Sequence, residues 1–274
     1  MAGKAEPTTP RKITPQVLRR LKERGEKITM LTAYDWLLAG LLDQAGVEVL
    51  LVGDSCGMVF HGYDSTLPVT MEQILIHTAA VARGARRAMV VGDMPFLSYQ
   101  VSDDEGMRNA GRLLKEAGAD AVKLEGGERV APLVTRMVAA GIPVVGHLGL
   151  TPQSIKAMGG YALQARTAAE ADRLLGEARC LEEAGIFCLI LEMVPADLAA
   201  RVTTELAVPV IGIGAGADCD GQVLVAQDML GLFEAFKPKF VRRYADLAAR
   251  IREAAGDYVA DVKGGDFPSA EESY

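Results

Sequence analysis

The sequence predicts an α/β protein, a single (β/α)8 TIM barrel with an N-terminal capping helix. Short apolar runs recur along the chain, and segments with apolar residues at helical spacing separate them. Ala-Gly followed by Val, Ala or Ile precedes several runs, at residues 45–47, 117–119, 140–142 and 184–186, and Gly suits the end of a helix. The length of 274 residues is within the usual range for one such barrel.

The apolar runs read as strands. Each is short and almost continuously apolar, which is typical of a strand buried on both faces in a parallel sheet. They lie at residues 28–33, 50–54, 89–93, 121–125, 143–147, 188–192, 208–213 and, less clearly, 222–225. Strands in βα alternation form parallel sheets, and eight of them over this length favour a closed barrel over an open doubly wound sheet.

The segments around the strands read as helices. The first, at residues 14–25, is short and basic, and we expect it to pack against the bottom of the barrel. Thr70 and Ser102 are suitable N-caps for two later helices. The other helical segments lie at residues 35–44, 71–86, 103–116, 129–139, 168–183, 196–205 and 238–255.

One barrel domain at residues 13–256 is the predicted organisation, with flexible tails at residues 1–12 and 257–274. The first tail is polar, is rich in Pro and Thr, and contains no apolar signal segment. The second contains Lys-Gly-Gly-Asp and an acidic end, a composition typical of a mobile terminus. No interdomain linker interrupts the pattern.

The composition narrows the classes of function. The net charge is −7 and no Lys/Arg cluster occurs, which argues against nucleic acid or an anionic membrane as partner. No apolar stretch is long enough to span a bilayer. The cysteines, Cys56, Cys180, Cys188 and Cys219, show no CxxC pair and no metal-ligand spacing, so we expect buried thiols in a reducing compartment. These features predict a soluble cytoplasmic protein.

Carboxylates end four of the apolar runs, at Asp54, Asp93, Glu125 and Glu192. An acid at the end of a buried strand is costly unless something pairs with it. The carboxyl ends of the strands carry the active site in barrels of this kind. Any one of these acids could be a helix N-cap or a loop residue, but a divalent cation is the simplest partner for several together.

Three further polar residues accompany these acids. Lys123 lies two residues before Glu125, so both side chains face the same way along a strand, and Lys123 could form a structural ion pair or hold a substrate carboxylate. His147 ends the fifth predicted strand, and its place in the site is inferred mainly from that position, because a lone histidine is more often a structural group than a catalyst. Ser55 follows Asp54 and could either bind a substrate carboxylate or be an ordinary loop hydroxyl.

Two histidines and a glycine-rich segment do not predict a further binding site. His61 and His77 belong to no recognisable constellation, and His77 is expected on a helix face. The glycine-rich segment at residues 212–216 fails the GxGxxG spacing because Ala217 occupies the final glycine position. It also follows the seventh strand rather than the first, so we interpret it as a close-packed barrel loop.

Long segments of the chain resemble the ketopantoate hydroxymethyltransferase family. They occur in the same order over residues 13–247, and only the two ends fall outside the resemblance. The segments are TAYD (32–35), VGDS (52–55), HGY (61–63), LPVTM (67–71), GDMPF (92–96), VKLEG (122–126), GHLGLTPQ (146–153), LEMVP (191–195), IGIGAG (211–216) and QDMLG (227–231).

The resemblance implies a fold similar to the phosphoenolpyruvate/pyruvate barrels and an aldol-type reaction. It implies hydroxymethyl transfer from 5,10-methylenetetrahydrofolate to 3-methyl-2-oxobutanoate, giving 2-dehydropantoate and tetrahydrofolate in pantothenate synthesis through a Mg²⁺-stabilised enolate. The family forms large rings, so a homo-oligomer, a decamer of two pentamers, is also implied.

The resemblance assigns roles to the residues at the strand ends. The magnesium site would comprise Asp54, Asp93 and Glu125, with Glu125 acting through water. Substrate binding would fall to Asp54, Ser55, Asp93, Lys123 and His147. Glu192 would be the catalytic base.

Two alternatives stay open at this point. A Mg²⁺-dependent carbon–carbon lyase of the pyruvate-barrel class would use the same metal acids but would not require folate. A non-catalytic keto-acid-binding barrel would keep Lys123 and Ser55 but would have no need for Glu192 as a base.

Overall fold

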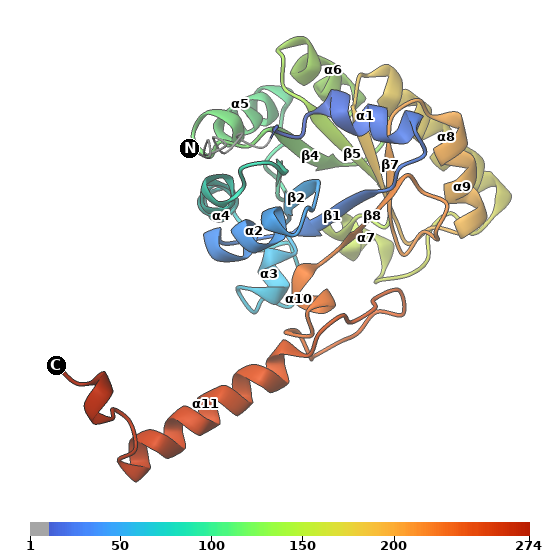
Figure 1. Ribbon diagram of the computed structural model, residues 1–274. Helices are drawn as coiled ribbons and strands as arrows, with labels where there is room; N and C mark the ends of the chain where they lie inside the picture. Colours follow the sequence, from blue (N-terminus) through green and yellow to red (C-terminus); the bar gives the residue numbers. More distant parts are fainter. Residues whose placement is uncertain (1–10) are drawn as a thin grey trace, which may run out of the picture. The chain divides into compact units, whose positions relative to one another are not determined.

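A closed parallel barrel forms the first part of the protein (Figure 1). The computed structural model describes residues 11–274. The chain divides into two compact units, and the boundary along the sequence lies between Leu224 and Val225. Strands β1 to β8 follow one another around the barrel in chain order, which confirms the predicted fold class. The strands are β1 (Ile28–Thr32), β2 (Val49–Val52), β3 (Met89–Asp93), β4 (Ala121–Glu125), β5 (Val144–Gly149), β6 (Cys188–Glu192), β7 (Val210–Ile213) and β8 (Gly221–Leu224).

Helices surround this barrel, and the predicted ones are present (Figure 1). Thr70 accepts a hydrogen bond from the Gln73 N–H and completes a capping box, while Ser102 accepts one from the Glu105 N–H, so both predicted N-caps are confirmed. The helices of the first unit are α1 (Pro15–Glu23), α2 (Trp36–Gln44), α3 (Cys56–Val59), α4 (Met71–Gly84), α5 (Asp103–Lys115), α6 (Ala131–Ala139), η1 (Pro152–Ser154), α7 (Ile155–Met158), α8 (Ala168–Glu183) and α9 (Ala196–Glu205).

Short helices after β2 and β5 were not predicted. Helices α3, η1 and α7 contain three or four residues each, which is too few for a helical period to be read from the sequence. They matter because they lie in the loops at the carboxyl ends of the strands.

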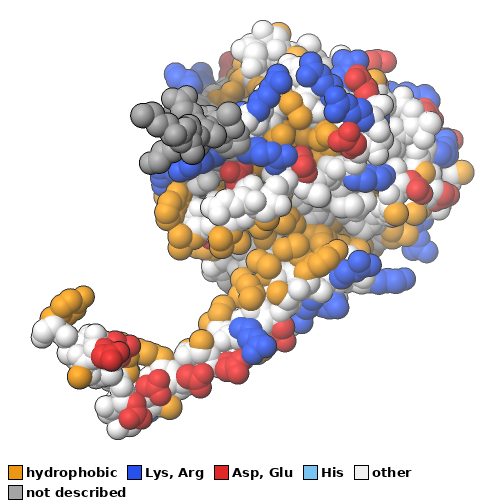
Figure 2. Space-filling model, in the orientation of Figure 1, with side chains coloured by type: hydrophobic (Ala, Val, Ile, Leu, Met, Phe, Trp, Pro, Cys, Tyr) orange, Lys and Arg blue, Asp and Glu red, His pale blue; other side chains and the backbone are white. Residues whose placement is uncertain are grey.

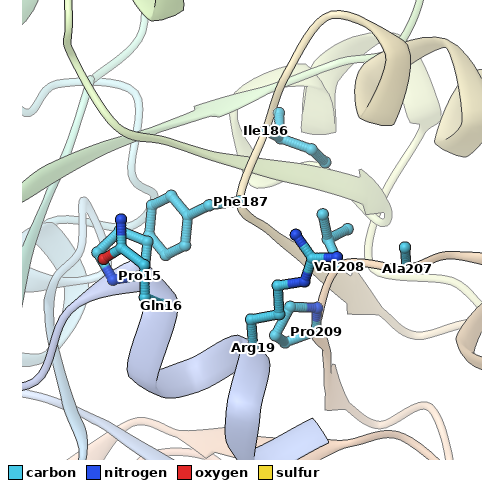
Figure 3. A pocket seen from close by; sticks show the side chains of 8 residues that line it. All are labelled: Pro15, Gln16, Arg19, Ile186, Phe187, Ala207, Val208 and Pro209. Carbon is cyan, nitrogen blue, oxygen red and sulfur yellow. The ribbon is translucent and has the colours of Figure 1, made fainter. Parts of the chain in front are cut away.

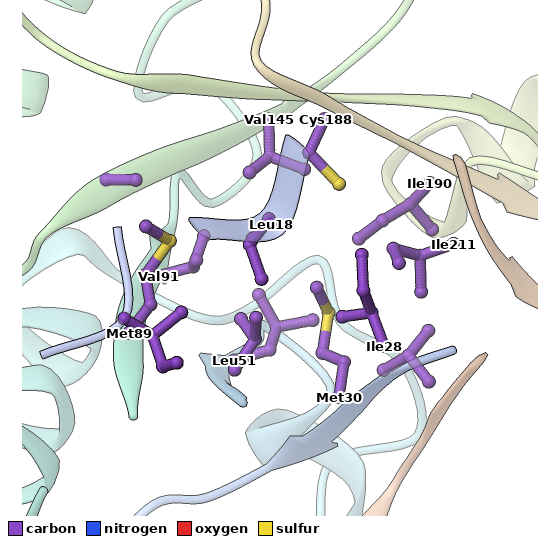
Figure 4. Close-up of a cluster of buried hydrophobic side chains, with 14 residues drawn as sticks. Leu18, Ile28, Met30, Leu51, Met89, Val91, Val145, Cys188, Ile190 and Ile211 are labelled. Atoms are coloured by element: carbon purple, nitrogen blue, oxygen red, sulfur yellow. The ribbon is translucent and has the colours of Figure 1, made fainter. Parts of the chain in front are cut away.

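An apolar cluster closes the bottom of the barrel. Leu18 of α1 is 1% exposed and packs in one cluster with Ile28, Met30 and Met89 from the first parts of the strands (Figure 4). The Lys22 ammonium donates hydrogen bonds to backbone carbonyls near β7 and pairs with Asp220 at 2.8 Å. Helix α1 therefore caps the bottom as predicted.

A groove of about 240 Å³ also lies at the bottom of the barrel. Pro15 and Arg19 of α1 line one side, and Ile186, Phe187 and Pro209 line the other (Figure 3). Its lining is mostly apolar and contains no carboxylate. The groove is therefore separate from the strand-end acids, which lie at the opposite ends of the strands.

The second unit, Val225–Tyr274, contains no strand among its described residues and has the helices α10 (Ala226–Met229), α11 (Leu247–Gly264) and η2 (Ala270–Glu272). The helix predicted at 238–255 begins later because the Tyr244 and Leu247 N–H groups donate to carbonyls of Met229 and Leu230. It also continues to Gly264, into the segment predicted as a tail.

The predicted tails stay predictions. Most of the first one, residues 1–10, lies outside the described residues. Across residues 11–274, no helix is both long and apolar enough to cross a membrane.

Candidate active site

Strand register brings the predicted site residues to one rim of the barrel. Asp93 at the end of β3 pairs in register with Lys123 of β4, and Glu125 of β4 pairs with His147 of β5. Glu192 ends β6, beside Gly149 of β5. Because parallel strands carry their carboxyl ends on the same side, these side chains converge without any special loop geometry.

Lys123 is the buried cation among these acids. Its ammonium lies 2.6 Å from Asp93 Oδ1 and 3.7 Å from Glu125 Oε1. Burial opposes a charge on Lys123, but Asp93, Glu125 and Asp54 together hold its pKa above the ordinary value. Lys123 therefore stays charged and offsets one of the negative charges at the rim.

Asp54 completes the group from the loop after β2. Its backbone N–H donates to Asp93 Oδ2 at 3.2 Å. Burial, followed by the charges of Asp93 and Glu125, raises the pKa of Asp54 well above its usual value. Burial also raises the pKa of Asp93, although Lys123 opposes this shift. The site therefore has more buried negative charge than Lys123 alone can balance.

His147 bridges this acidic group and Glu192. Its Nδ1 lies 3.3 Å from Glu125 Oε1 and its Nε2 lies 3.3 Å from Glu192 Oε2. Burial and Lys123 lower the pKa of His147, but the two glutamates outweigh them and raise it to about 9. Burial would raise the pKa of Glu125, yet His147 and Lys123 hold it below the ordinary value. The Glu192 side chain is 17% exposed, so it is the member of the set that opens toward solvent.

Gln153 and Tyr99 are parts of the site that the sequence analysis missed. The Gln153 amide donates to Asp54 Oδ2 at 3.0 Å, and its backbone N–H donates to Glu125 Oε2 at 3.1 Å. The Tyr99 hydroxyl donates to Gln153 Oε1 at 2.8 Å and accepts from the Glu125 N–H. Both residues lie outside the strands, so no strand-end pattern marked them.

Ser55 lies beside Asp54 with its hydroxyl against a buried tyrosine. Its Oγ is 2.8 Å from the hydroxyl oxygen of Tyr34, which is 1% exposed. Burial raises the pKa of Tyr34, so its hydroxyl keeps its proton and either oxygen can donate in this contact. Ser55 is thus positioned by a contact with the loop that follows β1.

The donor set suits a magnesium ion. Glu125 Oε1 is buried and lies near Lys123 and His147, but it accepts no hydrogen bond within the described residues. The charges of Asp54, Asp93 and Glu125 all act on the one lysine. Mg²⁺ prefers oxygen ligands and keeps several waters, so it needs only one or two direct carboxylates. Within residues 11–274, three residues with metal-ligand atoms all within 4.8 Å of one another lie elsewhere, at Cys56, His61 and His77. The assignment of Asp54 and Asp93 as metal ligands, with Glu125 acting through water, stays a prediction.

Two interpretations of other motifs are now resolved. His61 and His77 do form a constellation, contrary to the prediction, because their Nε2 atoms lie 3.0 Å apart. Spacing along the chain gave no sign of this, since the loop after α3 folds back onto α4. The loop at residues 212–216 is close-packed as predicted: Gly216 has φ +88° and lies against Ala196.

Comparisons of the sequence with known proteins indicate one family. A family model described as ketopantoate hydroxymethyltransferase matches residues 12–270. The 3-methyl-2-oxobutanoate hydroxymethyltransferase of Syntrophus aciditrophicus (strain SB) is 60% identical over 264 residues, which are 96% of this chain and 97% of that protein. A Bacteroides fragilis (strain YCH46) protein of the same name is 54% identical over 274 residues, covering 100% of both chains.

Solved structures give the same fold at low identity. The triclinic crystal structure of 2,3-dimethylmalate lyase, a PEP mutase/isocitrate lyase superfamily member, has a TM-score of 0.61 and 17% identity, covering 96% of this chain and 93% of that one. A phosphonopyruvate hydrolase complex with oxalate and Mg²⁺ has a TM-score of 0.59 and 15% identity, covering 94% and 92%. At these identities the likeness shows the fold alone.

Proposed function

Because the chain belongs to the ketopantoate hydroxymethyltransferase family, we propose that it transfers a hydroxymethyl group from 5,10-methylenetetrahydrofolate to 3-methyl-2-oxobutanoate. The products are 2-dehydropantoate, for pantothenate synthesis, and tetrahydrofolate. The hydroxymethyltransferase activity follows from membership and from identities of 60% and 54% to named relatives. The metal, the folate co-substrate and the role of each residue belong to the proposal.

One observation carries the assignment of roles, namely the His147 bridge between the buried acids and Glu192. It supports two separate roles for the carboxylates at the rim, metal binding and proton abstraction. Asp54, Asp93 and Glu125 would hold Mg²⁺, while Glu192 stays free at the open side to accept the proton on C3 of the keto acid. When bound, Mg²⁺ supplies Lewis-acid stabilisation of the negative charge that develops on the keto oxygen.

The remaining residues orient the substrate and the base. Lys123 has three donors, of which Asp93 accepts one at 2.6 Å, and Glu125 Oε1 lies 3.7 Å away without a hydrogen bond, so Lys123 can still donate to the substrate carboxylate. Ser55 Oγ would donate to the same carboxylate. With a pKa of about 9, His147 carries a positive charge near neutral pH and holds the Glu192 carboxylate toward the site.

Hydrogen exchange at C3 of 3-methyl-2-oxobutanoate tests this proposal. We expect proton NMR in deuterated water to show exchange with protein and Mg²⁺ but without folate. The Glu192→Gln variant should slow exchange by about 10²–10⁴-fold, because the amide cannot accept the proton. Glu183→Gln on the exposed end of α8 is the matched control and should exchange like the parent protein.

Each outcome separates one alternative. If Glu192→Gln exchanges as fast as the parent protein, Glu192 is not the base. If exchange is equally fast after a chelator is added, the reaction does not require the metal. A keto-acid-binding barrel would show no exchange at all. A lyase would exchange but would form no 2-dehydropantoate when methylenetetrahydrofolate is added.

The family resemblance also leads us to propose a homo-oligomer, specifically a decamer. Large apolar side chains on α2 and α4 support an assembly surface, because Trp36, Leu37, Leu41 and Ile76 are 55%, 68%, 64% and 70% exposed. Helices α2 and α4 contact each other, and hydrophobic side chains gather on this side of the barrel (Figure 2). A second copy of the chain would cover this α2–α4 surface.

The cytoplasm is the compartment that the proposal implies. All four cysteines are free, as expected in a reducing environment. The keto acid and the folate co-substrate of the proposed reaction would both be present in this compartment.

A further inference from the structure

Cys56, His61 and His77 form a cluster that the proposed reaction does not use. Cys56 opens α3, His61 follows that helix, and His77 lies on α4. One ligand atom from each residue lies within 4.8 Å of the other two. Cys56 and His77 are 0% and 7% exposed, while His61 reaches the surface. A thiol and two imidazoles from separate segments of the chain thus converge on one point.

His77 is already oriented as a metal ligand. Its Nδ1 lies 2.6 Å from the Tyr34 carbonyl oxygen, which can only accept, so Nδ1 carries the proton. The lone pair is therefore on Nε2, and this atom faces His61 Nε2 at 3.0 Å. A carbonyl that fixes the far nitrogen of an imidazole is a common outer contact of metal-bound histidines.

Aromatic rings restrict the movement of both imidazoles. Phe60 packs edge-on against His61 and His77, with ring centroids 5.3 and 4.8 Å away. Tyr63 stacks on His61 at 5.5 Å and 20°. The ring contacts thus hold the two histidines beside each other and leave their Nε2 atoms bonded only to one another, in a hydrogen bond that a metal would replace.

We propose that Cys56, His61 and His77 form a binding site for a zinc-class divalent transition metal. Two nitrogens and one sulfur are the donors that Zn²⁺ selects, whereas Mg²⁺ selects oxygen, so this site is chemically distinct from the strand-end acids. Three protein ligands leave a fourth position, which water can occupy on the side of His61.

Metal binding would require modest movements of the three side chains. Zn–N and Zn–S bonds of about 2.05 and 2.3 Å place tetrahedral ligand atoms about 3.4–3.6 Å apart. The two Nε2 atoms, now 3.0 Å apart, would have to separate by about 0.4 Å, and the sulfur would have to approach by no more than about 1.5 Å. Burial raises the pKa of the Cys56 thiol to about 12, so the cation must displace this proton, which passes to solvent.

A metal at this site would stabilise the loop that carries Asp54 and Ser55. Cys56 directly follows Ser55, whose Oγ contacts the Tyr34 hydroxyl, and the Tyr34 carbonyl holds His77. The metal would therefore connect α3 to α4 through atoms adjacent to the proposed substrate site. The inference itself does not depend on the proposed reaction.

Cobalt spectroscopy tests the site directly. Co²⁺ is added to the full-length protein in the presence of excess Mg²⁺, which occupies the oxygen site. We expect one equivalent of Co²⁺ to give strong visible bands of tetrahedral coordination and a near-ultraviolet thiolate-to-cobalt band. The second band requires sulfur, so cobalt bound to carboxylates alone cannot produce it.

Variants identify the ligands. Cys56→Ser should abolish the thiolate band, and His61→Gln should weaken Co²⁺ binding by about tenfold or more. Cys180→Ser on α8 is the matched control and should leave the spectrum unchanged. Circular dichroism and the Tm of each variant show that it is folded, and the surface position of His61 keeps one ligand testable if Cys56→Ser unfolds. Absence of a thiolate band in the parent protein, or its persistence in Cys56→Ser, would overturn the proposal.

Discussion

Gln153 uses its entire side-chain amide to arrange the acidic rim. Its Nε2 donates to Asp54 Oδ2 and to the Met94 carbonyl, at 3.0 and 2.9 Å. Its Oε1 accepts from the Tyr99 hydroxyl and from the Gln100 amide. With both donors and both acceptor positions engaged, Gln153 fixes the rotamer of Asp54, a proposed metal ligand, without binding the metal itself.

Replacement of Gln153 by Glu should weaken magnesium binding. The carboxylate is close in shape to the amide, but it cannot donate to Asp54, and it adds a negative charge beside a buried acid. We expect the Mg²⁺ concentration for half-maximal activity to rise by about 10–100-fold, the usual effect of losing an outer contact. A titration of activity with Mg²⁺ measures this.

The matched control is Gln16→Glu on the exposed face of α1, which should behave like the parent protein. An unchanged magnesium requirement in Gln153→Glu would mean that Asp54 is held by other contacts or is not a ligand.

The sequence marks some site residues and not others for a physical reason. Asp93, Glu125 and Glu192 end apolar strands, where an unpaired acid is costly, so their position alone predicts a shared site. Gln153 and the His61–His77 pair act through contacts between loops. Such contacts leave no periodic pattern, so they become visible only with the fold.

At the scale of elements, the join between β5 and β6 depends on a single glycine. Gly149 has φ +90°, and a side chain there would overlap the backbone carbonyl of Glu192. The Leu150 N–H donates to that same carbonyl at 2.8 Å. The end of β5 thus approaches the backbone of the proposed base so closely that only glycine fits.

Gly149→Ala should therefore impair both stability and activity. The left-handed conformation costs an alanine roughly 1–2 kcal/mol, and the overlap with Glu192 adds to this and displaces the base. We expect a lower Tm and a lower kcat, measured by thermal melting and by steady-state assay.

Gly141→Ala separates the two causes, because Gly141 has φ +84° but no atom within 4 Å of an added Cβ. It should lose roughly 1–2 kcal/mol of stability and keep its kcat. Equal kcat in the two variants would show that the β5–β6 join does not position Glu192.

The sequence predicted the long helices of the barrel but not the short ones. The strands were recognised as short, continuous apolar runs. Helices such as α4 and α8 have enough residues for a helical period to appear, and capping residues mark their starts. Helix α11 begins at Leu247 rather than at the predicted residue 238, because backbone hydrogen bonds to residues 229–230 hold the segment before Leu247 in a non-helical conformation. Composition alone carries no information about such bonds.

At the scale of the whole molecule, several large apolar side chains lie outside the core on neighbouring helices. Half of the residues are hydrophobic, yet Trp36, Leu41 and Ile76 are more than half exposed on neighbouring helices. Exposed apolar side chains that lie together are typical of a surface that another chain covers. The α2–α4 surface is therefore where we expect assembly to be most sensitive to substitution.

Replacement of Leu41 by Glu should disrupt the oligomer and leave the barrel folded. Leu41 is 64% exposed, so a charge there costs the single chain little, but it would be buried without a partner in the assembled form. Light scattering coupled to size-exclusion chromatography measures the mass. The parent protein should give ten times the 29.1 kDa chain mass, and Leu41→Glu a much smaller species with unchanged circular dichroism. Leu41→Met keeps the apolar contact and should assemble fully, so equal masses for the Glu and Met variants would place the assembly surface elsewhere.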